Sequence, residues 1–125
     1  MNGLTFDDYQ AQAKTTALYL DKFKETYPNL PKEVYEIMGI SYAGLGLGET
    51  GEVQGKIKKI IRDAGGNITD EVKKAIKKEL GDCMWYLAAN CSEFGFSLGE
   101  VAQENLDKLF SRKERGVLTG SGDNR

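Results

Sequence analysis

Four acidic residues form two pairs whose spacing could support metal-dependent chemistry. Glu49 precedes Glu52 by three positions, and Glu79 precedes Asp82 by the same interval. On a helix, residues three apart project from adjacent turns of one face. Apolar residues stand at helical spacing around both pairs, namely Leu45, Val53, Val72, Ala75, Ile76, Cys83 and Tyr86. The pattern therefore predicts that all four carboxylates face the interior.

Buried carboxylates need a cationic partner. An uncompensated buried carboxylate costs several kcal/mol, so either lysine and arginine neutralise these acids or a metal ion does. Oxygen ligands without nitrogen or sulfur favour a hard ion, most naturally Mg2+ with Mn2+ as a substitute. Mg2+ commonly completes its coordination with water and substrate phosphates. The acids thus point to chemistry on a phosphorylated ligand.

Polar and aromatic side chains surround the predicted acidic centre. Lysines follow the first acidic pair at helical spacing, and a third apolar stripe carries Asn105 with basic residues along its border. Cations around metal-binding carboxylates suit a polyphosphate. Trp85 and Tyr86 fit either a core or a surface on which a base stacks. The candidate substrate contacts are Lys56, Lys59, Trp85, Asn105, Lys108 and Arg112.

The elements that must position these residues are helices. Thr5, Thr69 and Ser97 are N-cap candidates, and Gly65 and Gly116 favour helix ends. Sustained strand-like alternation is missing from the sequence. We therefore expect an all-α chain with four helices, over about 5–26, 32–64, 69–94 and 97–116, followed by a C-terminal tail at 117–125.

Glycines are concentrated in the second expected helix, where each costs up to about 1 kcal/mol relative to alanine. Gly44, Gly48, Gly51 and Gly55 share one helical face. Close approach of another helix and access of a ligand to the backbone are both compatible with that face.

Composition limits the classes of function. With 125 residues, one domain is expected, and the net charge of -2 gives no reason to expect binding to nucleic acid or a membrane. The sequence has no histidine, which excludes His-dependent triads. Cys83 and Cys91 are too far apart on one helix to form a disulfide. Without a signal-peptide or membrane-spanning pattern, the expected location is cytoplasmic.

Three motifs together resemble one enzyme family. The segments GETGEV, ELGDCMWYLA and NLDKL are similar to those of MazG-like nucleoside triphosphate pyrophosphohydrolases, in the all-α NTP pyrophosphatase superfamily. That family has an ExxE pair and an ExxD pair on successive helices. The resemblance covers about residues 40–116. One departure is Gly48, where the family pattern often has glutamate, which affects the expected number of metal ions and the substrate.

The resemblance implies a fold and an activity. It implies a single MazG-like domain over residues 1–125, with core helices over about 33–116 in a four-helix bundle completed by a homodimer or tetramer. The implied reaction cleaves a nucleoside triphosphate between the α- and β-phosphates. Lys56, Asn105 and Lys108 match positions that contact phosphate or nucleotide, and the four acids would hold Mg2+. The alternatives are a non-catalytic nucleotide and Mg2+ sensor or an oligomerisation module.

Overall fold

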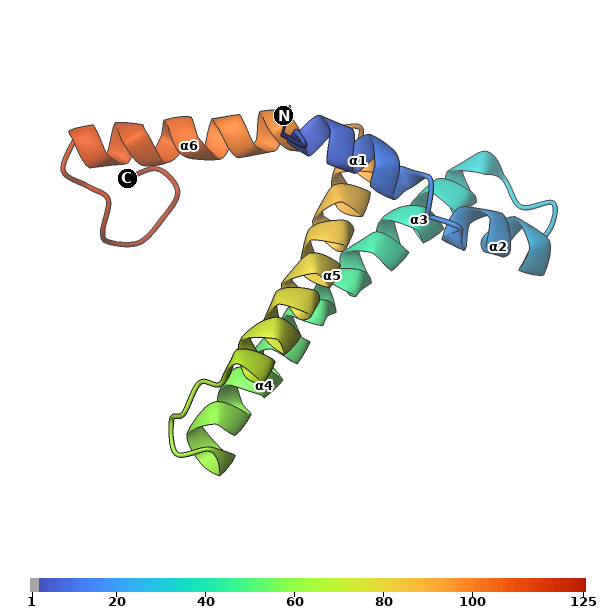
Figure 1. Ribbon diagram of the computed structural model, residues 1–125. Helices are drawn as coiled ribbons and strands as arrows, with labels where there is room; N and C mark the ends of the chain where they lie inside the picture. The colour runs from blue at the N-terminus through green and yellow to red at the C-terminus, as the bar shows by residue number, and fades with distance from the viewer. Residues whose placement is uncertain (1–2) are drawn as a thin grey trace.

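The chain is built from helices. The computed structural model describes residues 3–125, among which no strand occurs, so the all-α prediction is confirmed. Figure 1 shows the arrangement of the elements. The elements are α1 (Phe6–Lys14), α2 (Tyr19–Thr26), α3 (Lys32–Gly46), the 3-10 helix η1 (Leu47–Glu49), α4 (Thr50–Asp63), α5 (Asp70–Phe94) and α6 (Leu98–Glu114).

The first predicted helix is interrupted at residues 15–18. Thr5 caps α1 as expected, and its side chain accepts a hydrogen bond from the amide of Asp8. The hydroxyls of Thr15 and Thr16 donate to the carbonyls of Gln12 and Ala13, at 2.6 and 2.7 Å. Such local bonds compete with helix continuation. The chain therefore turns and begins α2 at Tyr19.

The second predicted helix is also divided, by the short 3-10 segment that joins α3 to α4. Close helix approach does occur here, but at Gly46, where a Cβ would overlap the Tyr86 ring of α5. At Gly48, Gly51 and Gly55 no heavy atom lies within 4 Å of where a Cβ would stand. Of the four glycines on that face, only Gly44 approaches α5, with Asn90 Oδ1 3.9 Å from where a Cβ would stand.

The central element is α5, which contacts α1, α3, η1, α4 and α6. Ala88 and Cys91 of α5 and Leu98 of α6 form a buried cluster, against which Tyr9 and Ala13 of α1 pack. Helices α1, α3 and α4 therefore pack mainly on α5, whereas α2 packs on α3 and α6 packs on both α1 and α5. Both cysteines are buried and free, as predicted from their spacing.

The chain changes direction sharply between α5 and α6. Gly95 adopts the left-handed conformation with φ of 78°, and the amide of Phe96 donates to the carbonyl of Cys91 at 2.7 Å. This is a glycine-based helix end, and Ser97 then caps α6. As a result, α6 points away from the pair formed by α4 and α5 (Figure 1).

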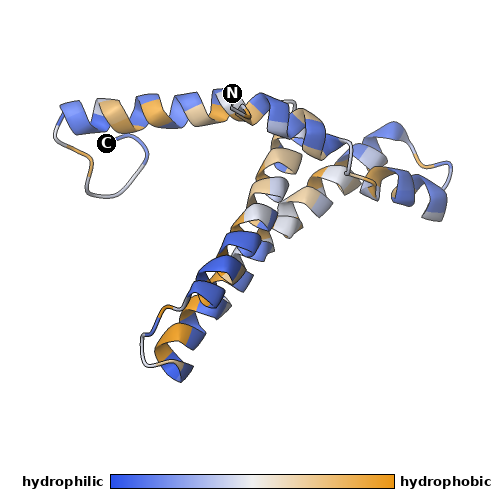
Figure 2. Cartoon of the chain, viewed as in Figure 1, coloured by the Kyte–Doolittle hydropathy of each residue, from blue (hydrophilic) through white to orange (hydrophobic). Residues whose placement is uncertain are grey.

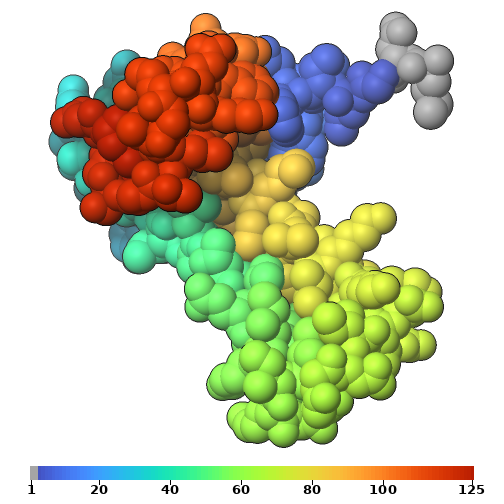
Figure 3. All heavy atoms as spheres, turned by 90° about the vertical axis from the view of Figure 1, so that its left-hand side faces the viewer, coloured from blue at the N-terminus to red at the C-terminus, as the bar shows by residue number. Residues whose placement is uncertain are grey.

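Helix α6 carries apolar side chains along its length (Figure 2). Within the described part of the chain its helix contacts are with α1 and α5. Seen from the side, the molecule narrows between the end that contains α6 and the end formed by α4 and α5 (Figure 3). The exposed apolar residues of α6 are Val101, Leu106, Leu109 and Phe110.

None of the helices described between residues 3 and 125 combines the length and apolarity needed to cross a membrane.

Candidate metal centre

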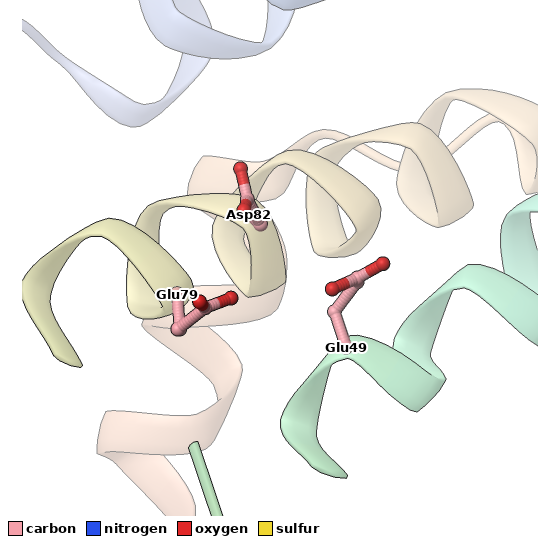
Figure 4. A group of neighbouring side chains, drawn as sticks. All are labelled: Glu49, Glu79 and Asp82. Atoms are coloured by element: carbon pink, nitrogen blue, oxygen red, sulfur yellow. The ribbon is translucent and has the colours of Figure 1, made fainter. Parts of the chain in front are cut away.

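Three of the four predicted acids come together between α5 and the end of η1. Glu49 ends η1, whereas Glu79 and Asp82 lie one turn apart on α5. Each contributes one carboxylate oxygen to a group whose atoms all lie within 4.8 Å of one another. In Figure 4, the carboxylates of Glu49 and Glu79 point toward each other across the space between the two segments. We call these three residues the acidic group.

Glu52 lies outside the acidic group and is exposed. The residues of α4 that turn toward the interior are Val53, Lys56 and Ile60, which follow helical spacing. One residue of an α-helix corresponds to about 100° of rotation, so Glu52 lies at the edge of the face that contains Val53. Asp82 is also exposed, although its carboxylate belongs to the group. The predicted inward orientation therefore applies best to Glu49 and Glu79.

A single lysine pairs with the acidic group among the ion pairs of residues 3–125. Lys56 Nζ lies 3.3 Å from Glu79 Oε1, and their side chains are 31% and 20% exposed. The formal charges of three carboxylates and one ammonium sum to -2 at this place (-3 plus +1). Lysine thus compensates only part of the charge, and a divalent cation would balance the remainder.

The spacing of the acidic group fits a small divalent ion. Mg2+ binds oxygen at about 2.1 Å, so two ligands on opposite sides of one ion are about 4.2 Å apart. The observed limit of 4.8 Å is slightly wider, and small side-chain rotations would close the difference. All three donors are hard carboxylate oxygens, the ligand type that Mg2+ prefers.

A hollow of about 440 Å³ adjoins the acidic group. Its lining residues are Thr16, Glu49, Asp82, Trp85 and Tyr86, and we call it the acidic hollow. Its volume falls within the range usual for small-molecule sites. The hollow is therefore lined by both carboxylates and aromatic rings.

Tyr86 remains a neutral donor in this hollow. Burial is the main cause that raises the pKa of the Tyr86 phenol above its usual value. A hydrogen bond with Tyr42 and the negative charges of Glu49 and Asp82 raise this pKa further. A phenol with a raised pKa stays protonated at neutral pH, so Tyr86 can donate a hydrogen bond but is a poor general base.

Trp85 is held by a residue that sequence reasoning did not select. Trp85 Nε1 donates to Thr16 Oγ1 at 2.9 Å, and the indole packs edge to face against Tyr86 with centroids 5.0 Å apart. Residues 15–18 were expected to be helical, so no sequence pattern indicated that Thr16 would line a hollow.

The predicted contacts of α6 are not brought to the acidic group within this chain. Asn105 and Lys108 are exposed. Arg112 is buried, but it contacts the tail: its Nη2 donates to the carbonyl of Asp123 at 3.0 Å. Lys59 is exposed on α4 and, with Lys56, lines a different hollow near the end of α4.

Comparison with known proteins gives a consistent assignment. Gene 37 protein of Mycobacterium phage L5 is 46% identical over 120 residues, which cover 95% of this chain and 97% of that protein. Comparison with the solved structures finds no match. Residues 41–117, which include the whole acidic group, match the MazG nucleotide pyrophosphohydrolase domain. The chain belongs to the MazG nucleotide pyrophosphohydrolase family.

Proposed function

We propose that this protein is a Mg2+-dependent nucleoside triphosphate pyrophosphohydrolase. It hydrolyses a ribo- or deoxyribonucleoside triphosphate between the α- and β-phosphates to yield the monophosphate and pyrophosphate. The observation that carries the proposal is the convergence of Glu49, Glu79 and Asp82 beside an aromatic-lined hollow, in a chain of the MazG family.

Glu49, Glu79 and Asp82 would hold the ion, and Glu52, three residues after Glu49, would act at the border of the same site. When bound, Mg2+ would neutralise charge on the phosphate oxygens and make a neighbouring water more acidic. Lys56 already pairs with Glu79 and supplies a further positive charge for a phosphate. Mn2+ would serve as a substitute because it accepts the same oxygen ligands.

The reaction also needs a group that accepts the proton of the attacking water and groups that stabilise the pyrophosphate as it leaves. The oxygen of water attacks the α-phosphorus, and the bond from that phosphorus to the bridging oxygen breaks. We assign Glu52, which follows Glu49 by three residues, as the carboxylate that would accept the proton of the attacking water. Pyrophosphate leaves with increased negative charge, which nearby basic side chains stabilise.

The basic side chains of α6 would act in a homodimer or in a tetramer made of two dimers. Lys108 and Arg112 carry charges suited to pyrophosphate, and Asn105 would bind the nucleotide. Support comes from the exposed apolar residues of α6, including Leu109 and Phe110, which a second copy would cover. In such an assembly α6 of one copy approaches the acidic group of the other.

The reaction is tested by incubating the protein with Mg2+ and a panel of canonical and modified nucleoside triphosphates. Monophosphate, pyrophosphate and free phosphate are quantified separately. We expect equal amounts of monophosphate and pyrophosphate from at least one nucleotide, loss of turnover with EDTA, and recovery when Mg2+ is added in excess. Nucleotide binding without turnover would contradict catalysis and favour the sensor.

A further inference from the structure

A second hollow lies next to the acidic hollow and is lined mainly by aromatic rings. Its volume is about 340 Å³. We call it the aromatic hollow; it is lined by Thr16, Tyr19, Phe23, Tyr42 and Trp85, with Leu18 and Lys22 completing the lining. Tyr19 and Tyr42 are stacked, with ring centroids 4.5 Å apart. The two hollows share Thr16 and Trp85, so these two residues form a common wall.

The common wall is fixed by directional contacts. The Thr16 hydroxyl donates its proton to the carbonyl of Ala13 and accepts from Trp85 Nε1, at 2.7 and 2.9 Å. Tyr19 packs edge to face against the indole with centroids 6.4 Å apart. Since the hydroxyl proton is already engaged, the oxygen is oriented as an acceptor toward the indole. Thr16 thereby holds Trp85 in one orientation.

The pair of hollows matches the two chemical ends of a nucleotide. Trp85 follows Asp82 by three residues on α5, about 5 Å along the helix axis. A nucleotide separates its α-phosphate from its base by one ribose ring, and the flat faces of a base stack well on aromatic side chains. Phosphates at the carboxylates thus leave the base beside the aromatic rings.

We propose that the base of the substrate binds in the aromatic hollow against Trp85, and that Thr16 is a positioning residue for this contact. This inference rests on the proposed nucleotide substrate. Thr16, Tyr19 and Phe23 all precede residue 41, where the MazG match begins. The N-terminal helices therefore contribute base affinity, whereas the acidic group lies within the matched segment.

Thr16→Val tests the positioning role, because it keeps the side-chain volume and removes the hydroxyl. The matched control is Thr15→Val, which removes the equivalent hydrogen bond to the carbonyl of Gln12. Thr15 lines neither hollow. The KM for the best nucleotide of the panel is compared with the inhibition constant of inorganic tripolyphosphate, which has no base. Thr16→Ser retains the hydroxyl and serves as the conservative variant.

For Thr16→Val we expect the nucleotide KM to rise about fivefold, the usual effect of one hydrogen bond. We expect kcat and the tripolyphosphate constant to stay within about twofold, and Thr15→Val and Thr16→Ser to resemble wild type. An unchanged KM in Thr16→Val, or an equal weakening of tripolyphosphate, would overturn the proposal.

A second measurement uses the fluorescence of Trp85, the sole tryptophan of the chain. With Mg2+ present, nucleoside triphosphate should change the tryptophan emission more than tripolyphosphate does, because only the nucleotide carries a base that contacts the indole. Equal responses to both ligands, or no response to nucleotide, would overturn base binding at Trp85. This titration needs no turnover, so it tests the aromatic hollow even where the hydrolysis assay fails for the whole nucleotide panel.

Discussion

The acidic group is assembled within one chain, whereas the polar residues predicted on α6 are not brought to it. Glu49, Glu79 and Asp82 converge because η1 and α5 pack side by side. Asn105 and Lys108 were predicted by the same reasoning from apolar stripes, yet they remain exposed on a helix that points away. Apolar periodicity predicts which face of a helix needs covering. It does not tell whether the same chain or a second copy covers that face.

The largest expected effect comes from removing one member of the acidic group. Glu79→Gln keeps the side-chain shape but removes a charge that Lys56 and a metal ion would share. Loss of a group that only orients a metal ligand costs roughly 10–100-fold in activity, so we expect more than about 100-fold here. Circular dichroism checks the fold, and product release measures activity. Glu33→Gln, an exposed change on α3, is the control. Full activity of Glu79→Gln would remove this residue from the site.

A mixing experiment tests whether α6 serves a second copy. Lys108→Ala and Glu79→Gln should each be inactive alone. If each site combines the acids of one copy with α6 of its partner, a mixed dimer has one intact site. Equal mixing then restores about a quarter of wild-type activity, because half of the dimers are mixed and one of their two sites works. Subunits are exchanged by refolding together, and product release is measured. No recovery after confirmed exchange would favour action within one chain.

The contact between α2 and α5 at Tyr19 can be tested through the pH dependence of the free energy of unfolding. Burial raises the pKa of the Tyr19 phenol well above its usual value, and a hydrogen bond to the Glu93 carboxylate adds to the shift. The pKa of Tyr19 in the unfolded chain is about 10, and below that pH the contribution of Tyr19 to stability is fully present. As pH rises above about 10, the unfolded chain loses its phenolic proton first, so this contribution is progressively lost. We expect a decline of about 1.4 kcal/mol per pH unit in that range.

Denaturant unfolding at several pH values measures this decline. Tyr19→Phe should flatten the profile above about pH 10, whereas Tyr27→Phe, at an exposed ring, should not. Identical slopes for wild type and Tyr19→Phe would contradict the assignment.

The smallest expected effect concerns the attachment of α6 to α1. Asp7 Oδ1 accepts hydrogen bonds from Ser97 Oγ and the amide of Gly99, at 2.6 and 2.9 Å. The bond from Ser97 is the main cause that lowers the pKa of Asp7, and the bond from Gly99 adds to it. The contribution of Asp7 is therefore present at neutral pH and is lost as pH falls through the lowered pKa.

Asp7→Asn should increase amide hydrogen exchange at the start of α6 while leaving α4 and the acidic group protected. Asp21→Asn, an exposed change on α2, provides the comparison. Exchange at Gly99 that does not differ between Asp7→Asn and wild type would show that the bonds of Asp7 do not hold α6 to α1.

The sequence predicted the parts of the fold that local chemistry determines. Thr69 and Ser97 cap α5 and α6 where expected, because their side chains bond to amides three residues ahead. The break at residues 15–18 was not predicted, since threonines are compatible with helices and turns alike. The three-residue spacing in the sequence identified both acidic pairs. The exposure of Glu52 was not predicted, because it depends on how α4 is rotated about its axis against α5. Thr16 was missed because its partner, Trp85, is distant in sequence.

The buried thiols make this chain a convenient host for spectroscopic labels. Cys83 and Cys91 are both free and buried, and burial raises the pKa of Cys91. A buried, protonated thiol reacts slowly with maleimides and methanethiosulfonates. A cysteine introduced at the exposed Lys113 of α6 would therefore take up a spin label well before the native thiols. Distances between two such labels in solution would map the course of α6 in the assembled protein.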